Sequence, residues 1–152
     1  MINTKGPIID FDGDGMTDFA IYRANTGVWY IDSSSGAPSY GFPWGGKPSD
    51  IPVPGDYDGD GKTDLAIYRA DSGDRLIKPS AGGNHAGFRW GGDLSDIPVP
   101  GDYDGDGKTD YAVYRANEGT WYVIPSGGGN YIGMQWGGDP SDIPITLDLP
   151  SF

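Results

Sequence analysis

The stretch Asp-Tyr-Asp-Gly-Asp-Gly-Lys-Thr-Asp occurs twice without change, at residues 56–64 and 102–110. A near copy, Asp-Phe-Asp-Gly-Asp-Gly-Met-Thr-Asp, occupies residues 10–18, so the three copies start 46 residues apart. A fixed period of this size is typical of repeat architectures, in which one supersecondary unit is used several times. The 152-residue chain is therefore predicted to be one domain of three tandem repeats. The predicted repeats span about 6–50, 51–96 and 97–142.

Each repeat is predicted to form four short antiparallel strands. A Ser-Asp-Ile-Pro segment precedes the acidic loop and reads as an extended strand, whose prolines limit its ladder hydrogen bonds. The second strand, such as 65–69, is rich in β-branched and aromatic residues, and the fourth ends in Trp-Gly-Gly. The 27 glycines and 13 prolines argue against long helices. An extra terminal strand is predicted at 143–149, and a first strand at 6–11. If two chains associate, the terminal strand of one chain and the first strand of the other would compete for the same position in a sheet.

The acidic loop has the spacing Asp-x-Asp-x-Asp-Gly-x-x-Asp, with carboxylates at positions 1, 3, 5 and 9. Four carboxylates so close together repel one another unless a cation lies among them. Calcium accepts about 6–8 oxygen ligands at roughly 2.3–2.6 Å in loose geometry, and glycine at position 6 permits the sharp bend. The loop is not an EF-hand, because position 12 is Ile21, Ile67 or Val113 and not Glu.

We therefore predict about three Ca²⁺ ions per chain, one in each loop. The backbone carbonyl at position 7 can serve as a further ligand in each loop. The predicted metal ligands are Asp10, Asp12, Asp14, Met16, Asp18, Asp56, Asp58, Asp60, Lys62, Asp64, Asp102, Asp104, Asp106, Lys108 and Asp110, of which Met16, Lys62 and Lys108 act through the carbonyl.

Composition disfavours several other partners. Four Asp in each of the three loops account for 12 of the 22 acidic residues, and the net charge is −12. We expect no nucleic-acid partner, since no basic stripe could neutralise phosphates. No apolar run is long enough to span a membrane, so no membrane partner is expected. Zinc is disfavoured by the absence of Cys and the single His.

With these loops between its first two strands, the repeat resembles the FG-GAP/VCBS family, typified by integrin α-subunit propellers and by many secreted bacterial proteins. The resemblance rests on the loops, on the Ala-Ile/Val-Tyr-Arg that follows them, and on the Ser-Asp-Ile-Pro before them. It implies an all-β fold with one β-propeller blade per repeat, calcium in each loop and an extracellular, secreted setting. It also implies a role in adhesion or ligand binding.

Three repeats are fewer than the 4–8 blades of typical closed propellers. We predict that two chains associate head to tail as a homodimer that forms a six-bladed ring. A rotation that fails to close would give filaments instead. The alternative fold is a β-trefoil-like monomer, which also uses three repeats of four strands.

Two further sets of residues recur with the same period. The tryptophans either pack between repeats or provide a stacking platform for sugar rings. They are Trp44, Trp90 and Trp136. The arginines either form ion pairs with acids such as Asp50, Asp96 or Asp142, or bind a ligand. They are Arg23, Arg69 and Arg115.

No catalytic constellation stands out, because every carboxylate cluster is repeated and fits a metal better, so we expect no enzyme activity. The predicted function is a calcium-stabilised extracellular binding module, lectin- or adhesin-like, that binds glycans or proteins. The alternative is a structural, designed or excised repeat fragment that self-assembles and has no ligand of its own.

Overall fold

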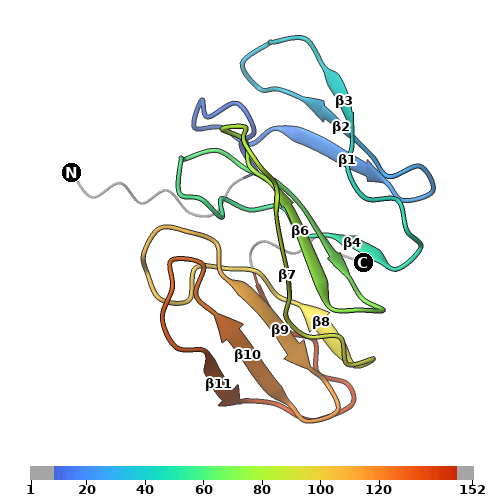
Figure 1. The fold of residues 1–152 in the computed structure, drawn as a ribbon, viewed down its shortest axis with the longest axis vertical. Coiled ribbons are helices and arrows are strands. Elements are labelled where there is room, and N and C mark those ends of the chain that lie inside the picture. The colour runs from blue at the N-terminus through green and yellow to red at the C-terminus, as the bar shows by residue number, and fades with distance from the viewer. Residues whose placement is uncertain (1–8, 147–152) are drawn as a thin grey trace.

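A computed structural model describes residues 9–146 of the chain, and its regular structure is entirely β (Figure 1). In these residues, eleven strands form three separate antiparallel sheets, with three, four and four strands in chain order. Within this range no helix is long and apolar enough to cross a membrane. The predicted all-β class and the antiparallel repeat unit are therefore confirmed.

The strands of each sheet follow one another along the chain. The first sheet comprises β1 (Phe19–Arg23), β2 (Val28–Asp32) and β3 (Tyr40–Pro43). The second comprises β4 (Asp50–Pro52), β5 (Leu65–Arg69), β6 (Asp74–Lys78) and β7 (Ala86–Arg89). The third comprises β8 (Asp96–Pro98), β9 (Tyr111–Arg115), β10 (Thr120–Ile124) and β11 (Ile132–Gln135).

The second and third acidic loops each connect two antiparallel neighbours, as the sequence predicted. β4 lies before the second loop and pairs with β5, which lies after it. An isolated bridge between Gly55 and Asp64 extends this pairing toward the loop. The third sheet repeats this arrangement with a Gly101–Asp110 bridge. In the first sheet the N–H of Asp18 donates to the carbonyl of Ile9 (2.7 Å), although the described residues before β1 form no strand.

The glycines of the Trp-Gly-Gly segments are needed because each segment passes close to the turn between the second and third strands of its own repeat. Gly73 in the β5–β6 turn has a φ of 74°, and a Cβ on it would lie 2.5 Å from the carbonyl carbon of Gly91. Gly91 itself has a φ of 101°. Any larger residue at either position would therefore combine an unfavourable backbone conformation with a steric clash.

The three sheets pack face to face in a row, and the apolar core lies between them (Figure 1). Leu65 and Ile67 of β5 belong to the cluster shared with the first sheet. The alternate residues Ala66 and Tyr68 belong to the cluster shared with the third sheet. Strand β5 is therefore buried on both faces, which explains why its sequence lacks a polar face.

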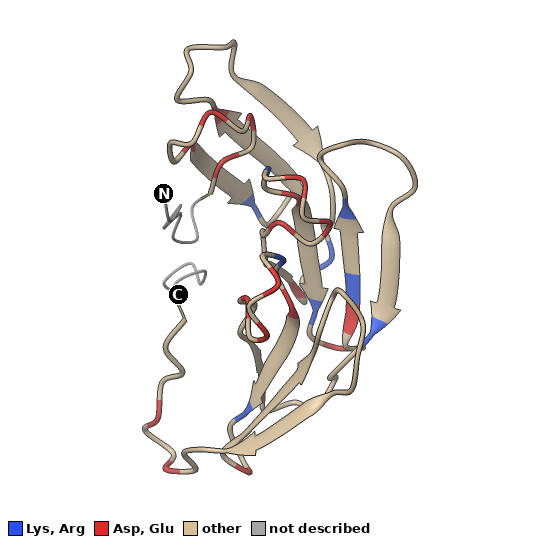
Figure 2. Cartoon of the chain, turned by 90° about the vertical axis from the view of Figure 1, so that its left-hand side faces the viewer, with Lys and Arg blue, Asp and Glu red and all other residues tan. Residues whose placement is uncertain are grey.

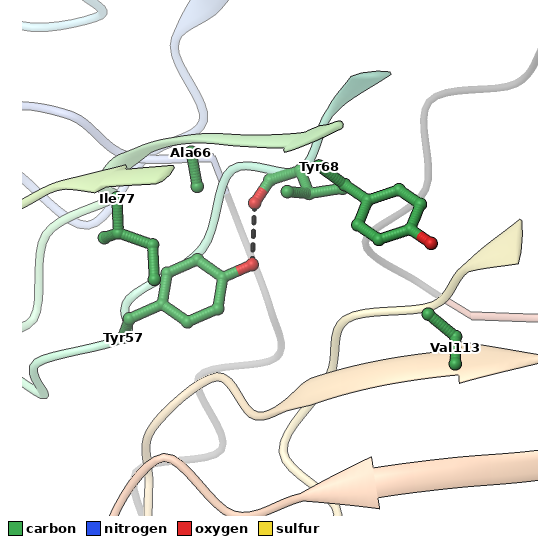
Figure 3. Packing of buried hydrophobic residues seen from close by; sticks show 6 residues of the cluster. Tyr57, Ala66, Tyr68, Ile77 and Val113 are labelled. Carbon is green, nitrogen blue, oxygen red and sulfur yellow. Dashed lines mark hydrogen bonds between the residues drawn. The ribbon is translucent and has the colours of Figure 1, made fainter. Parts of the chain in front are cut away.

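Figure 3 shows the cluster between the second and third sheets. Tyr57 comes from the second acidic loop, and its hydroxyl donates to the carbonyl of Val53 (2.8 Å). Its ring stacks on that of Tyr111 in the third sheet, with 5.2 Å between the centroids. The aromatic residue at position 2 of the loop thus anchors the loop in the core.

Two of the recurring tryptophans link neighbouring sheets. The indole N–H of Trp44 donates to the carbonyl of Leu76 in β6 (3.1 Å), and that of Trp90 donates to Tyr122 in β10 (3.3 Å). Trp136 follows the last strand and is 76% exposed. The structure therefore uses the first two tryptophans in packing between repeats, and the third has no sheet beyond it.

The row of sheets does not close within the described residues, since the first and third sheets lie at its two ends (Figure 1). Of the predicted first strand 6–11, residues 6–8 lie outside the described part of the chain. Of the predicted terminal strand 143–149, residues 143–146 form no strand, and 147–149 lie outside the description. The corresponding segments of the earlier repeats, β4 and β8, form strands by pairing with the strand that follows the next acidic loop. In the described chain, no strand after residue 143 could pair with residues 143–146 in this way.

Arg75 departs from the repeat pattern in the core of the described chain. It is 1% exposed where the other repeats carry Trp29 and Trp121, and burial lowers the pKa of its guanidinium. Its Nη2 donates to the carbonyl of Ala112 (2.8 Å), whereas Nε and Nη1 are buried without a hydrogen-bond partner. Burying a cation without an acidic partner opposes folding.

We predict that Arg75→Met raises the free energy of unfolding by about 1–4 kcal/mol, because an apolar side chain of similar length removes the buried charge. Urea denaturation in calcium buffer measures the effect. Arg89→Met is the control, since the Arg89 side chain is 69% exposed and its loss should change stability by less than about 0.5 kcal/mol. A less stable Arg75→Met protein would show that the arginine is satisfied.

Candidate metal centres

Three groups of carboxylates gather in the acidic loops, one group per repeat. Within each group, three carboxylate oxygens lie within 4.8 Å of one another. These are the residues at loop positions 1, 3 and 9. The groups are Asp10, Asp12 and Asp18; Asp56, Asp58 and Asp64; and Asp102, Asp104 and Asp110. Figure 2 shows the acidic loops one after another along the same side of the row of sheets.

The carboxylate at position 1 shapes each loop. Asp10 accepts the backbone N–H groups of Gly13 (2.6 Å) and Asp14 (3.2 Å) through Oδ1, and that of Gly15 (2.9 Å) through Oδ2. Both glycines have positive φ, 81° and 91°, which lets the chain coil around the carboxylate. Loops two and three repeat this pattern around Asp56 and Asp102.

The carboxylate at position 9 is the buried member of each group. Asp64 is fully buried, and its oxygens accept the N–H groups of Tyr57 (2.9 Å) and Ser80 (2.7 Å). Burial outweighs these bonds and raises the pKa of Asp64 to about 6. Burial also raises the pKa of Asp110 in the third loop. A buried carboxylate that resists ionisation is one that a nearby cation would stabilise.

The groups at position 3 differ in their surroundings. Desolvation raises the pKa of Asp58, and its like-charged neighbours Asp60 and Asp56 add to the effect. The Asp12 carboxylate instead accepts a hydrogen bond from the hydroxyl of Ser35 (2.5 Å), which lowers its pKa. The first loop therefore has a polar neighbour at this position that partly compensates the crowding of its charges.

The carboxylates at position 5 lie outside these groups of three. Asp60 accepts the N–H of Lys62 (2.8 Å) and the hydroxyl of Ser80 (2.6 Å). Asp14 makes the same contacts with Met16 and Ser34, each at 2.8 Å, and Asp106 accepts the N–H of Lys108 (2.8 Å). In this conformation position 5 closes the loop onto the turn after the third strand of the repeat.

The donor set fits calcium. Two ligands of one ion, each about 2.3–2.6 Å from it, lie at most about 5 Å apart. The three carboxylate oxygens of each group, all within 4.8 Å of one another, meet this limit. All the donors are oxygens, and no Cys or His lies in the groups. Hard oxygen ligands in a flexible loop suit calcium better than zinc or magnesium.

The loops also join neighbouring sheets to one another. The N–H of Asp10 donates to the hydroxyl of Thr63 (2.8 Å), and the N–H of Thr63 donates back to the carbonyl of Asp10 (2.7 Å). Asp56 and Thr109 repeat this pair between the second and third loops, at 3.0 and 2.7 Å. Position 1 of the first and second centres is thus held by position 8 of the next loop.

The lysine at position 7 also contacts a neighbouring loop through its side chain. A Cβ on Gly13 would lie 3.1 Å from Cε of Lys62, and one on Gly59 would lie 2.9 Å from Cε of Lys108. The lysine stems therefore cover the preceding acidic loop. Only a backbone role was predicted for them.

The predicted ion pairs of the recurring arginines are present in the second and third sheets. Arg69 donates through Nε and Nη2 to the two carboxylate oxygens of Asp50 (2.8 and 3.2 Å). Arg115 binds Asp96 in the same way and at the same distances. Such paired contacts fix geometry as well as charge, and here they join the first two strands of a sheet.

Sequence reasoning missed the serines and threonines that support the loops. The backbone N–H groups of Ser34, Ser80 and Ser126 all donate to position 9, and Thr63 and Thr109 link the loops. Their period was visible, since both sets recur every 46 residues. Their roles depend on which segments meet in space, which the period alone does not reveal.

Comparison with known proteins supports the resemblance predicted from the sequence. Residues 10–67 match the family model described as FG-GAP-like repeat, and this match covers the first two acidic loops. A search of curated proteins and a search of solved structures found no match.

We predict that Asp58→Asn removes one tight calcium site of three. The amide can still accept the N–H of Asp60 (3.0 Å in the parent), so the loop keeps its hydrogen bond and loses one charge. Isothermal titration should show the stoichiometry fall from about three to about two, since site affinity depends on ligand charge. Asp71→Asn, an exposed change outside the loops, should leave it unchanged. Equal stoichiometry in both variants would contradict a role for Asp58.

Proposed function

We propose that this chain, whose residues 10–67 match the FG-GAP-like repeat family, is a calcium-stabilised extracellular binding module without catalytic activity. Each sheet is then one blade of a β-propeller, with one calcium ion in the loop between its first two strands. The observation that carries the proposal is the recurrence of three carboxylates within 4.8 Å in all three loops.

In each blade the carboxylates at positions 1, 3 and 9 would hold the ion, and the carbonyls of Met16, Lys62 and Lys108 are further candidate ligands. Position 5 would join by turning from its serine contact toward the ion. Bound calcium supplies two positive charges that offset the repulsion among the carboxylates. Because position 1 is hydrogen-bonded to the next loop, ordering one loop also supports the contact between blades.

The role of calcium predicts strong stabilisation by the metal. Calcium at about 100 times its dissociation constant stabilises a one-site protein by about 2.7 kcal/mol, and three independent sites would add. For a chain of this size we expect a rise in Tm of at least roughly 5–10 °C between EDTA and millimolar calcium, measured by circular dichroism. An equal Tm in both buffers would contradict the proposal, and magnesium in place of calcium tests the selectivity.

A lectin- or adhesin-like role follows from the family resemblance and from the exposed aromatic rings. Tyr40, Tyr131 and Trp136 are 46%, 62% and 76% exposed. Aromatic faces stack on sugar rings, and exposed aromatic residues are enriched in protein-binding surfaces. An extracellular setting would provide the calcium that the loops need.

The alternative role is a structural repeat fragment that assembles with itself and binds no other ligand. The unpaired faces at the two ends of the row of sheets favour this alternative. A glycan array probed in calcium and in EDTA separates the two roles. We expect a lectin to bind a related set of sugars in calcium and to lose them in EDTA. Absence of glycan binding by a folded, calcium-loaded protein would exclude the lectin role and favour the structural one.

A further inference from the structure

Within residues 9–146, the first sheet lacks the strand that begins the other two. β4 and β8 each lie beside the strand that follows an acidic loop, whereas β1 forms the outer edge of its sheet. An unpaired edge strand offers its N–H and C=O groups to another segment of chain. The missing strand would align with Ile21, Tyr22 and Arg23, because β8 aligns with the corresponding residues of β9.

The sequence of the missing strand is present near the other end of the chain. Residues 141–144 read Ser-Asp-Ile-Pro, identical to residues 49–52 and 95–98, which form β4 and β8 with the serine before each. One period before β4, residues 3–6 read Asn-Thr-Lys-Gly instead. The beginning of the chain therefore lacks the aspartate of this strand, and residue 142 supplies it.

The charges of the two regions are complementary. Asp50 and Asp96 pair with Arg69 and Arg115 through two hydrogen bonds each. Arg23 occupies the equivalent place in β1, but it is exposed and contacts only the Tyr30 hydroxyl (3.0 Å) and ring within the described chain. Asp142 accepts the N–H groups of Gly138 and Asp139 and has no arginine partner there.

Apolar exposure follows the same pattern. Ile145 is 81% exposed, whereas its equivalents Val53 and Val99 are 1% and 0% exposed. Ile21 is 58% exposed, whereas its equivalents Ile67 and Val113 are 0% and 1% exposed. Ile145 and Ile21 are thus exposed at positions that the other repeats bury.

We propose that residues 141–145 of one copy add as the fourth strand to β1 of a second copy, and that two copies exchange this strand to close a six-bladed ring. Asp142 then pairs with Arg23 of the partner copy in the geometry of Asp50–Arg69 and Asp96–Arg115. This inference goes beyond the calcium-binding role and does not depend on any ligand.

Two further contacts between sheets have exposed halves at the same ends. Thr17 is exposed where Thr63 and Thr109 are buried, so it can bind the main chain of Asp102 in the other copy. Trp136 can donate to the carbonyl of Tyr30, as Trp44 donates to Leu76 and Trp90 to Tyr122. A hollow of about 500 Å³ beside β1, lined by Phe19, Ile21 and Tyr30 among others, lies on the face that the third sheet of the partner would cover.

A second copy is the occupant that fits, because one chain carries both halves of the contact at opposite ends of its row of sheets (Figure 1). Every complementary contact runs in one direction, from the third sheet of one copy to the first sheet of the next. Closed propellers contain about 4–8 blades, so three cannot close and six can. The ring also leaves no exposed sheet edge at β1.

The mass of the protein in calcium buffer, measured by light scattering after size exclusion, tests the closed pair. We expect the mass to reach twice the 16.2 kDa chain mass and to rise no further as the protein concentration increases. A mass of one chain would overturn the proposal. A mass that grows with concentration beyond two chains would indicate an open filament and would also overturn it.

Charge reversal tests the strand exchange itself. Arg23→Glu and Asp142→Arg each place like charges together, so each variant should run as a single 16.2 kDa chain. The double variant exchanges the signs and should recover the pair. Arg23 and Asp142 are exposed, so the single variants should keep the circular dichroism of the parent.

Arg89→Glu is the matched control, since it reverses an exposed arginine that pairs with Asp74 inside the second sheet. It should leave the mass of the pair unchanged. Single reversals that keep the double mass, or a double variant that stays a single folded chain, would show that residues 141–145 do not bind β1 of a second copy. These outcomes are independent of the calcium melting experiment, which reports on the loops.

Discussion

Repulsion among the aspartates of each acidic loop is the constraint on which the rest of the structure depends. Three carboxylates lie within 4.8 Å at the point where the first two strands of a repeat meet. The same loop hydrogen-bonds to the next loop through Thr63 or Thr109. A cation bound there, as we propose, would relieve the repulsion, fix the strand connection and support the contact between sheets. Metal binding in the loops would thereby stabilise the whole row of sheets.

The contacts between sheets are modular, because each one uses the same positions in every repeat. A tryptophan binds a carbonyl of the next sheet, a threonine binds the main chain of the previous loop, and the alternate residues of the second strand of each repeat fill the two cores. Modular contacts of this kind leave complementary surfaces at the two ends of any open row. The association between copies that we propose would use these same repeated contacts and would need no additional kind of interface.

The period of 46 residues was enough to predict the class of fold, the order of strands, the acidic loops and the Arg69–Asp50 and Arg115–Asp96 pairs. It could not show that Asp60 turns toward Ser80, because that choice depends on where the following turn lies in space. Nor could it show that Lys62 covers the neighbouring loop. The buried position of Arg75 was equally hidden, since its strand reads as a weaker copy of 28–31 and 120–123. Local pattern thus predicted what recurs within a repeat, and contacts between repeats required the structure.

Crystals grown in calcium and measured with long-wavelength X-rays would test the metal centres most directly. We expect three anomalous peaks per chain, each about 2.3–2.6 Å from carboxylate oxygens at positions 1, 3 and 9 of one loop. Loops that keep the same fold with no anomalous peak among their aspartates would contradict calcium as the element that holds these repeats together.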